Sequence, residues 1–479
     1  MLRDVVSFDE FFRRQKKDSS VYQARAKFIR FIEERIGGQF TYDAARFPYY
    51  RPDLADLFEI AEKMRSRGVL TSYAPRYSLP DEPQYREWRA VYRDGEDSTA
   101  SGTSIDDDRA ALSAALAEAN ERHMWFETTD HFQDKRTATL AEVQQIGAVI
   151  APHEFAGFTD SQRATIPHLT LRDVPYVWTR AYSLVDDTRI YIPAQVTSGT
   201  NQLRARRFQH IEPTILYPIT NGLASWPTQE GVRLRGLLET IERDAYMITW
   251  QNQLTPPRFS TEALASESPT LAKLVQTSRR YRLEPHFLRL ITDAPTYAVM
   301  TILEDHSGHA PRFAFGIKAN ASPAQAAAGA LFEALRGRRG ARRFIKAGIP
   351  TPKRERVGHI DRVLYWADSA RAELLAFLIA GEVMEHSEEW RNESEAAHYA
   401  RLIAWIHSRG YRAVSVPYTQ SAKNLTPWHV EFIAVPELQP IYFNEQEPHI
   451  GGVRLTEVPR LLGYTPRTEP YTEHPHPFS

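Results

Sequence analysis

The sequence has 479 residues, of which 42% are hydrophobic and 25% are charged, so it has enough apolar material for a buried core. Its 59 lysines and arginines nearly balance its 60 aspartates and glutamates. No overall positive field therefore favours nucleic acid or an anionic membrane surface as a partner. The absence of cysteine excludes disulfides, thiolate catalysis and zinc–thiolate sites.

The first residues and the apolar runs favour a cytoplasmic protein. The opening stretch, MLRDVVSFDEFFRR, has acids where a signal peptide would have its apolar region. The longest apolar run, LLAFLIAG at residues 374–381, is far shorter than the roughly 20 residues that cross a bilayer. We therefore expect a cytoplasmic protein without membrane contact.

The first predicted elements, up to about Leu79, are short amphipathic helices such as SVYQARAKFIRFIEERI. We interpret residues 1–80 as an accessory region. A polar stretch, RDGEDSTASGTSIDDD, then leads into a helix predicted over residues 109–127, and its aspartates suit the positive end of the helix dipole. Two strand-like runs, RIYIPAQV and PTILYPIT, follow.

A second helix is predicted around residues 237–250, and a third begins with Ser322 as the cap and Pro323 in the first turn. Gly337 and Gly340 are expected to end this third helix. The strand patterns WHVEFIAV and LQPIYF precede a proline-rich tail, TPRTEPYTEHPHPFS. Helices and strands without regular alternation predict an α+β fold.

Two of the predicted helices share the pattern Glu-x-x-Glu-Arg. Its two copies are Glu118, Glu121 and Arg122, and Glu239, Glu242 and Arg243. Residues three apart are neighbours on a helix, so each pair of glutamates repels by a few tenths of a kcal/mol. The second copy leaves only a narrow polar strip on an otherwise apolar helix, which is not typical of a solvated face.

One such pattern alone is usually surface decoration with a local ion pair. Two copies in mostly apolar helices favour a functional interpretation, because buried carboxylates need compensating cations. Magnesium is the physical candidate, since it prefers carboxylate oxygens and usually shares its coordination with phosphates. The pattern therefore indicates a metal and nucleotide site, with surface decoration as the alternative.

Other nucleotide and metal motifs are missing. The sequence has no Gly-x-x-x-x-Gly-Lys-Ser/Thr loop, no Gly-x-Gly-x-x-Gly and no His-Glu-x-x-His. DHSGH, at residues 305–309, has potential metal ligands, but we favour a turn. The basic run RGRRGARRFIK, at residues 336–346, is a candidate for contact with phosphate or an acidic peptide, although most such runs are solvated.

Six segments occur in a fixed order between about Asp94 and the last residue: AEANER, TNGLA, LLETIERDA, ASPAQAAAGALFEALRGR, VPELQPIYFNEQEPHIGGVRL and HPHPFS. Together they resemble the YcaO family of ATP-dependent cyclodehydratases, which form thiazoline and oxazoline rings in ribosomally synthesised peptides. The resemblance implies a mixed helix and sheet ATP-binding catalytic domain over residues 81–464. It also implies a proline-rich tail over residues 465–479.

The resemblance further implies that ATP binds through Mg²⁺ ions held by glutamates. By position, the catalytic and metal-binding acids are Glu118, Glu121, Glu239 and Glu242. The residues implied near nucleotide or phosphate are Ser113, Arg122, Asn221, Arg243, Glu333 and Arg336. Pro475 and Pro477 match the tail prolines that reach toward the active site in azoline-forming members. For Asn221, a turn-forming role in Asn-Gly is an equal alternative.

In the family reaction, a Cys, Ser or Thr side chain of a precursor peptide attacks the preceding backbone carbonyl, and ATP phosphorylates the resulting amide oxygen before phosphate leaves. The implied partners are the precursor peptide, an E1-like leader-peptide-binding protein and an FMN-dependent azoline dehydrogenase.

Three departures from the family pattern leave alternatives open. SGTSID lacks the lysine of the usual Gly-Lys-Gly, Ala114 replaces a serine with Ser113 one place early, and Arg336 replaces a glutamine. A non-catalytic scaffold subunit is one alternative. Thioamide or amidine formation is another, within the same family.

Overall fold

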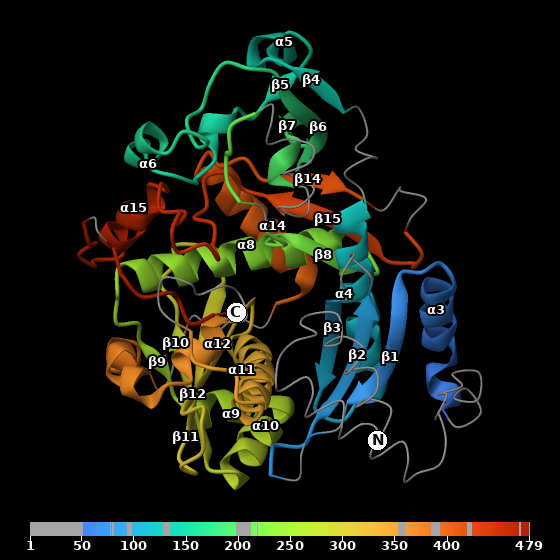
Figure 1. Ribbon diagram of the computed structural model, residues 1–479, viewed down its shortest axis with the longest axis vertical. Helices are drawn as coiled ribbons and strands as arrows, with labels where there is room; N and C mark the ends of the chain where they lie inside the picture. The colour runs from blue at the N-terminus through green and yellow to red at the C-terminus, as the bar shows by residue number, and fades with distance from the viewer. Residues whose placement is uncertain are drawn as a thin grey trace. The chain divides into compact units, whose positions relative to one another are not determined.

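The computed structural model describes residues 51–76, 78, 81–92, 98–127, 135–197, 212–217, 219–352, 361–384, 393–418, 424–468 and 471–478. The chain forms two compact units, each with its own hydrophobic core (Figure 1). The first unit contains the residues up to Phe126 together with 422–428, and the second contains the rest. The helix predicted at SVYQARAKFIRFIEERI lies outside the described residues.

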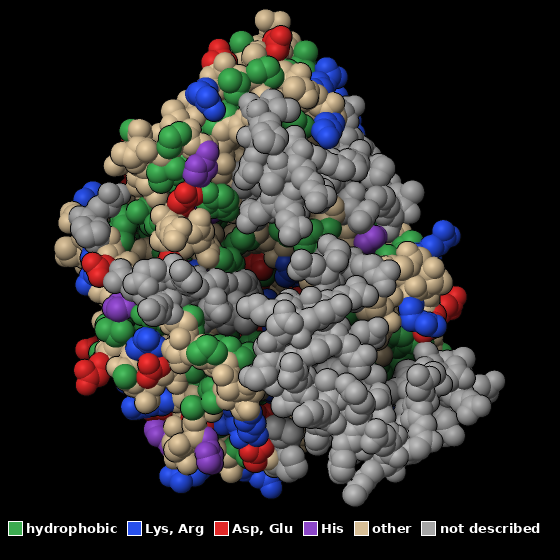
Figure 2. All heavy atoms as spheres, in the orientation of Figure 1, with side chains coloured by type: hydrophobic (Ala, Val, Ile, Leu, Met, Phe, Trp, Pro, Cys, Tyr) green, Lys and Arg blue, Asp and Glu red, His purple; other side chains and the backbone are tan. Residues whose placement is uncertain are grey.

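The described surface carries charges of both signs. On the face drawn in Figure 2, basic and acidic side chains are interspersed among hydrophobic and other polar atoms. This mixture follows from the nearly equal numbers of acidic and basic residues. Within the described ranges, no helix is both long enough and apolar enough to cross a bilayer.

The first unit packs helices against a three-stranded antiparallel sheet of order β1-β2-β3. Its elements are η2 (Pro52–Leu54), α3 (Ala55–Ser66), β1 (Leu70–Arg76), β2 (Arg86–Tyr92), β3 (Ser98–Ser104) and α4 (Asp108–Glu127). Phe58, Trp88 and Leu112 lie in its core. Among the described strands, β3 pairs with β2 alone, so its other side is a sheet edge.

Two strands of this unit correct the sequence analysis. β1 lies where only amphipathic helices were predicted, and β3 lies in the stretch interpreted as a polar connection. The inward-facing positions of β3 are the small residues Ala100 and Gly102, so the strand lacks an alternation of large apolar residues. A Cβ on Gly102 would lie 1.9 Å from the backbone oxygen of Ala111, so glycine allows α4 to approach the sheet closely.

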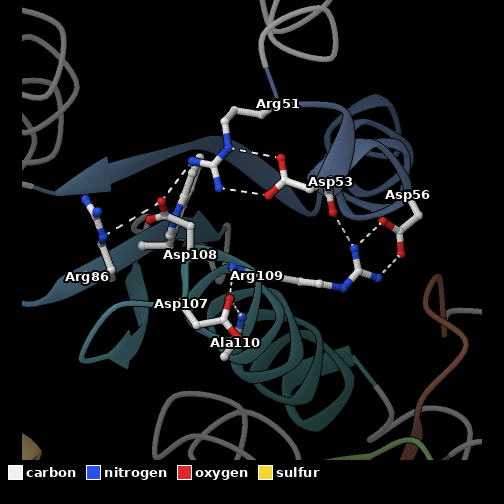
Figure 3. Close-up of polar contacts among 9 residues, drawn as sticks. Arg51, Asp53, Asp56, Arg86, Asp107, Asp108, Arg109 and Ala110 are labelled. Carbon is white, nitrogen blue, oxygen red and sulfur yellow. Dashed lines mark hydrogen bonds and ion pairs between the residues drawn. The ribbon is translucent and has the colours of Figure 1, made fainter.

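Polar contacts fix the start of α4 (Figure 3). Asp108, its first residue, accepts hydrogen bonds from Trp88 Nε1 at 3.0 Å and from Arg51 at 2.8 Å. Arg109 donates to Asp56 at 2.7 Å, but this pair is exposed and therefore contributes little. The carboxylate of Asp108 also suits the positive end of the helix dipole. The helix thus begins one residue before the predicted start.

The second unit contains two sheets with α8 (Gln229–Gln251) between them (Figure 1). The seven-stranded sheet has the order β5-β7-β6-β14-β15-β8, with β4 also paired to β6. Its strands are β4 (Arg136–Ala138), β5 (Ala148–Val149), β6 (Tyr176–Ser183), β7 (Arg189–Pro193), β8 (Leu223–Trp226), β14 (Val414–Pro417) and β15 (His429–Ala434).

The five-stranded sheet has the order β12-β11-β10-β9-β13, which makes β12 an edge strand. Its strands are β9 (Arg258–Phe259), β10 (Leu283–Arg289), β11 (Tyr297–Asp305), β12 (Phe313–Asn320) and β13 (Val383–Met384). α8 contacts β8 and β15 of the first sheet and β11 and β12 of the second. The apolar character predicted for this helix follows from burial between the two sheets.

The remaining helices surround these sheets, and α11 packs on β11 and β12. They are α5 (Leu140–Gln144), α6 (Asp160–Thr165), α9 (Thr261–Glu267), α10 (Pro269–Arg280), α11 (Pro323–Lys346), α12 (Asp361–Trp366), α13 (Ala376–Ile379), α14 (Glu395–Ser408) and α15 (Arg454–Leu461), with the short 3-10 helices η4 (Pro152–Glu154), η5 (Ala194–Val196) and η7 (Ser369–Leu375). Together these elements confirm the predicted α+β class.

The start of α11 was predicted correctly and its end was not. Ser322 caps the helix by accepting a hydrogen bond from the backbone of Gln325, and Pro323 is its first residue. The helix continues through Gly337 and Gly340 to Lys346. Each internal glycine costs about 1 kcal/mol relative to alanine. Burial of the apolar residues Leu331, Leu335 and Ala341 on this helix offsets part of the cost. Arg338, Arg339 and Arg342 are buried as well, which corrects the interpretation of the basic run as solvated.

Among the strand predictions, RIYIPAQV contains β7 and WHVEFIAV contains β15. PTILYPIT and LQPIYF were wrong, because their described residues are irregular. Side chains take up the backbone amides that a strand ladder would use. Ile215 N donates to Gln195 at 3.0 Å, and Gln439 N donates to Asp244 at 2.8 Å.

Candidate functional site

Glu239 and Glu242 lie near the middle of α8 and are held by backbone amides from two different sheets. Glu239 Oε2 accepts a hydrogen bond from Gly222 N, just before β8, at 2.9 Å. Glu242 Oε2 accepts one from Ala319 N, on β12, at 2.7 Å. The side chain of Glu239 is 27% exposed and that of Glu242 is 1% exposed. These glutamates are therefore not surface decoration.

Arg243 bridges the two glutamates. Its guanidinium lies 3.3 Å from Glu239 Oε1 and also pairs with Glu242 Oε1. Each carboxylate therefore has one oxygen fixed by a backbone amide and the other facing a cation. Burial alone would lower the pKa of Arg243, but the adjacent glutamates raise it, so the guanidinium stays charged.

Glu333 on α11 repeats this arrangement. Its Oε2 accepts a hydrogen bond from Ile317 N of β12 at 3.2 Å. Ile317 and Ala319 are two residues apart on β12, and backbone N–H directions alternate along a strand. Both amides therefore point away from β11, toward the open edge of the sheet. Glu333 and Glu242 thus satisfy neighbouring amides of one edge strand, which brings α8 and α11 to the same strand.

Charge in this cluster of the second unit is only partly balanced. Burial raises the pKa of Glu242 to about 7, against the opposing effects of Arg243 and Lys318. The side chain of Lys318 is exposed to solvent, yet enough protein surrounds it that desolvation lowers its pKa. Glu242, Glu333 and Glu239 outweigh that effect and raise the pKa of Lys318 overall. Three carboxylates therefore face two cations.

The first unit holds the other copy of the pattern. Glu118 Oε2 on α4 accepts a hydrogen bond from Ser101 N of β3 at 3.0 Å. Arg122 lies 3.6 Å from Glu118 and 4.0 Å from Glu121. Glu118 is 33% exposed, so this copy is more open than the one on α8. In both units, a helix glutamate accepts from an edge-strand or turn amide and has an arginine beside it.

Asn221 fits both of its interpretations. Its Oδ1 is buried without a hydrogen-bond partner among the described residues, and amide oxygens are acceptable ligands for hard cations. With Ile219 and Thr240 it lines a mainly apolar cavity of about 70 Å³. The following Gly222 has φ 88°, so Asn221 also belongs to a turn.

Ser113 and Arg336 are both half-buried, on α4 and α11 respectively. Arg336 lies three residues after Glu333, on the helix whose carboxylate contacts β12. DHSGH lies at the end of β11 and forms the predicted turn, in which Ser307 N donates to Asp305 at 2.7 Å.

The tail prolines are buried in the second unit. Pro475 O accepts a hydrogen bond from Trp366 Nε1 at 2.9 Å, and the buried Pro477 leads to Phe478. The Arg362 guanidinium donates to His476 O at 3.0 Å. These contacts give the tail a fixed path, as its proline content predicts.

Phe478 connects this tail to the glutamate pair. Its ring centroid lies 4.3 Å from the Arg243 guanidinium carbon, and its backbone N donates to Tyr246 Oη at 3.2 Å. A guanidinium over an aromatic face is attracted by the ring quadrupole. The sequence analysis missed both Phe478 and Lys318, since neither belongs to a charge pattern. For Phe478, the available sequence signal was its position as the aromatic residue of the tail motif HPHPFS.

The donor set in the second unit consists of carboxylate oxygens and the free amide oxygen of Asn221, and this chemistry fits Mg²⁺. Arg243 occupies one oxygen of both Glu239 and Glu242. Within the described residues, no three acidic, histidine or cysteine side chains already converge in a metal-binding arrangement. A bound cation would therefore have to compete with Arg243 for these oxygens.

Solved structures share this fold. A heterocyclase in complex with substrate and cofactor matches 88% of this chain, with a TM-score of 0.70 and 20% sequence identity. The match covers 57% of the heterocyclase, so this chain spans little more than half of the heterocyclase's length. YcaO from Methanopyrus kandleri, bound with AMPPCP and Mg²⁺, matches 82% of this chain and 93% of its own, with a TM-score of 0.58 and 17% identity.

The E. coli microcin synthetase McbBCD complex with pro-MccB17 bound matches 85% of this chain and 96% of its own, with a TM-score of 0.61 and 13% identity. No curated protein has a matching sequence. The fold thus places the chain among α+β proteins that share the architecture of these solved structures. A family model described as YcaO cyclodehydratase, ATP- and Mg²⁺-binding, matches residues 101–439.

This match covers well over half of the chain, so the chain belongs to the YcaO family. The predicted resemblance is confirmed, and ATP and Mg²⁺ are the ligands in the family's description.

Proposed function

We propose that the chain is an ATP- and Mg²⁺-dependent peptide cyclodehydratase that converts Cys, Ser or Thr residues of a precursor peptide into thiazolines or oxazolines. The observation that carries the proposal is the arrangement of the α8 glutamates. Each has one oxygen fixed by a backbone amide and the other facing Arg243. Such outer contacts orient carboxylates for metal binding.

In this proposal, the Mg²⁺ ligands are Glu118 and Glu121 in the first unit and Glu239 and Glu242 in the second. The residues proposed near nucleotide are Ser113, Arg122, Asn221, Arg243, Glu333 and Arg336. When bound, Mg²⁺ neutralises negative charge on the transferred phosphoryl group. Arg243 is suited to face the negative charge of the phosphoryl group. It pairs with Glu239 and Glu242, which are the carboxylates that would bind the metal.

The proposed reaction removes one water per ring. The substrate Sγ or Oγ gives up its proton and forms a bond to the preceding backbone carbonyl carbon. The former carbonyl oxygen then bonds to the γ-phosphorus of ATP, whose bond to the β-phosphate oxygen breaks and releases ADP. That oxygen then leaves as part of inorganic phosphate, while the amide nitrogen loses its proton and forms the ring C=N bond. Phosphorylation matters because an unmodified amide oxygen is a poor leaving group. The tail residues Pro475 and Pro477 support the site through the backbone path that they fix.

The proposed partners are a precursor peptide, an E1-like leader-binding protein and an FMN-dependent azoline dehydrogenase. The support is indirect: one structural relative is a synthetase complex with a bound pro-peptide, and another is a heterocyclase with bound substrate. A cytoplasmic location stays a prediction.

The test is Glu239→Gln, which keeps an acceptor for Gly222 N but removes the charge. We expect Mg²⁺-dependent binding of a non-hydrolysable ATP analogue to weaken roughly 10- to 100-fold. Glu262→Gln is the matched control, because Glu262 is 73% exposed on α9 and pairs with Arg279. Isothermal titration with and without Mg²⁺ measures both. Equal binding by the two variants would contradict the assigned metal site.

Product mass separates the chemistries. With a precursor peptide, its leader-binding partner, ATP and Mg²⁺, the account predicts loss of one water for each ring formed. Exchange of oxygen for sulfur would instead identify thioamide formation. If the protein bound no nucleotide with Mg²⁺ even in the presence of its partner, it would be a scaffold subunit.

A further inference from the structure

Lys318 lies between the two edge-strand amides that hold the acidic side chains. Its neighbours on β12, Ile317 and Ala319, donate their backbone N–H groups to Glu333 and Glu242. Alternate side chains of a strand point to opposite faces. Ile317 and Ala319 point into the core, and Lys318 therefore points to the face covered by α11.

α11 leaves room for the Lys318 side chain. A Cβ on Gly329 would lie 2.8 Å from Lys318 Cγ and 3.3 Å from its Cβ and Cδ. A glycine inside a helix is unfavourable relative to alanine, and here it lets an aliphatic stem cross the helix. The stem is thus packed between strand and helix, while the side chain as a whole remains exposed.

The Lys318 ammonium is positioned by an electrostatic field rather than by an ion pair. Among the described residues, no side chain forms a hydrogen bond or an ion pair with it. Glu242, Glu333 and Glu239 nevertheless attract it, which favours its charged form. A charged donor with three available N–H groups therefore reaches solvent beside the carboxylates.

We propose that Lys318 binds a phosphate group of the nucleotide. This inference rests on the proposed function and adds to it a phosphate contact at a residue outside both glutamate patterns. An ammonium donates short, charge-assisted hydrogen bonds to phosphate oxygens and acts as a point charge toward them. Its stem is fixed in advance, so little side-chain entropy is lost on binding.

Lys318→Met tests the contact, since it retains an unbranched apolar stem and removes the charge. A charge-assisted hydrogen bond of this kind corresponds to a loss of roughly 10- to 100-fold in affinity for a non-hydrolysable ATP analogue with Mg²⁺. Affinity for adenosine, which has no phosphate, should not change. Lys318→Arg should retain most of the affinity for the triphosphate. Lys273→Met, at an exposed position of α10, is the matched control and should bind like the parent.

Gly329→Ala gives a second, independent test without changing any charge. The new Cβ must displace the Lys318 stem, so triphosphate affinity should fall while adenosine affinity is kept. Equal triphosphate affinity in Lys318→Met and Lys273→Met would overturn the inference, even if Glu239→Gln still weakened metal-dependent binding. Parallel losses for adenosine and triphosphate would also overturn it, because they indicate a general distortion. If the parent protein bound no Mg²⁺–nucleotide, the proposed function and this inference would fail together.

Discussion

At the scale of single residues, the α8 glutamates show how a chain keeps buried carboxylates. Glu242 is 1% exposed, and an isolated ionised carboxylate there would cost several kcal/mol. Ala319 N and Arg243 offset that cost from opposite sides of the carboxyl group. Arg243 in turn stacks on Phe478. The tail therefore acts on the glutamate pair through one guanidinium.

A buried histidine gives the protein a predictable response to acid. Burial lowers the pKa of His398 to about 4, and the charge of Arg401 acts in the same direction. As pH falls from about 6.5 toward 4, the unfolded chain binds a proton at this position that the folded chain does not. The free energy of unfolding should fall by up to about 1.4 kcal/mol per pH unit from this group. Chemical denaturation between pH 7 and 4 measures the change.

His398→Gln is the control, because glutamine still offers a hydrogen bond to Thr296 Oγ1, which lies 3.1 Å from the imidazole. The variant should lose stability less steeply than the parent over the same pH range. If both proteins lose stability in parallel, His398 does not contribute the predicted slope.

Sequence reasoning identified the acidic residues but not their partners. Glu118, Glu121, Glu239 and Glu242 follow from one spacing rule within a helix. The amide donors lie on strands far away in sequence, such as Ala319 for Glu242, and depend on tertiary packing. Lys318 was missed for the same reason.

At the scale of elements, the close contact of α11 with β12 positions both Glu333 and Lys318. A Cβ on Gly316 would lie 2.0 Å from Ala330 O and 2.7 Å from Glu333 Cβ, so the helix backbone rests directly on the strand. Any larger residue at position 316 would push the helix away. Glu333 would then lose its hydrogen bond from Ile317 N.

Two glycine-to-alanine substitutions test this contact. Gly316→Ala should lower the free energy of unfolding by about 1–3 kcal/mol or more, because the well-packed contact becomes overfilled. Gly340→Ala lies inside α11, where an added Cβ would meet no atom within 4 Å. It should raise stability by up to about 1 kcal/mol through helix propensity. Equal effects of the two substitutions in urea denaturation would contradict the close-contact account.

The elements that sequence predicted best were the long helices with caps and strong periodicity. α4 begins one residue before its predicted start, and Ser322 caps α11 as expected. The end of α11 was not predictable, because the burial of Ala341 and the pairing of Arg338 with Asp305 depend on residues elsewhere in the fold. PTILYPIT was misassigned because Ile215 N and Tyr217 N donate to the side chains of Gln195 and His449 instead of to another strand.

At the scale of the whole molecule, the family match runs from within β3 to Gln439. It includes the two proposed glutamates of the first unit and the three of the second, while the tail lies beyond it. The predicted boundaries at residues 80 and 464 stay predictions. The heterocyclase with a TM-score of 0.70 is much longer than this chain, which covers 57% of it.

The central claim is that the α8 glutamates bind divalent cations together with a nucleoside triphosphate. The most direct measurement is a crystal structure with Mn²⁺ and a non-hydrolysable ATP analogue, in which anomalous scattering locates the metal. The account predicts Mn²⁺ about 2.1 Å from a carboxylate oxygen of Glu239 or Glu242, with phosphate oxygens completing its coordination. A bound nucleotide whose metal contacts neither residue, with Arg243 still bridging both carboxylates, would contradict it.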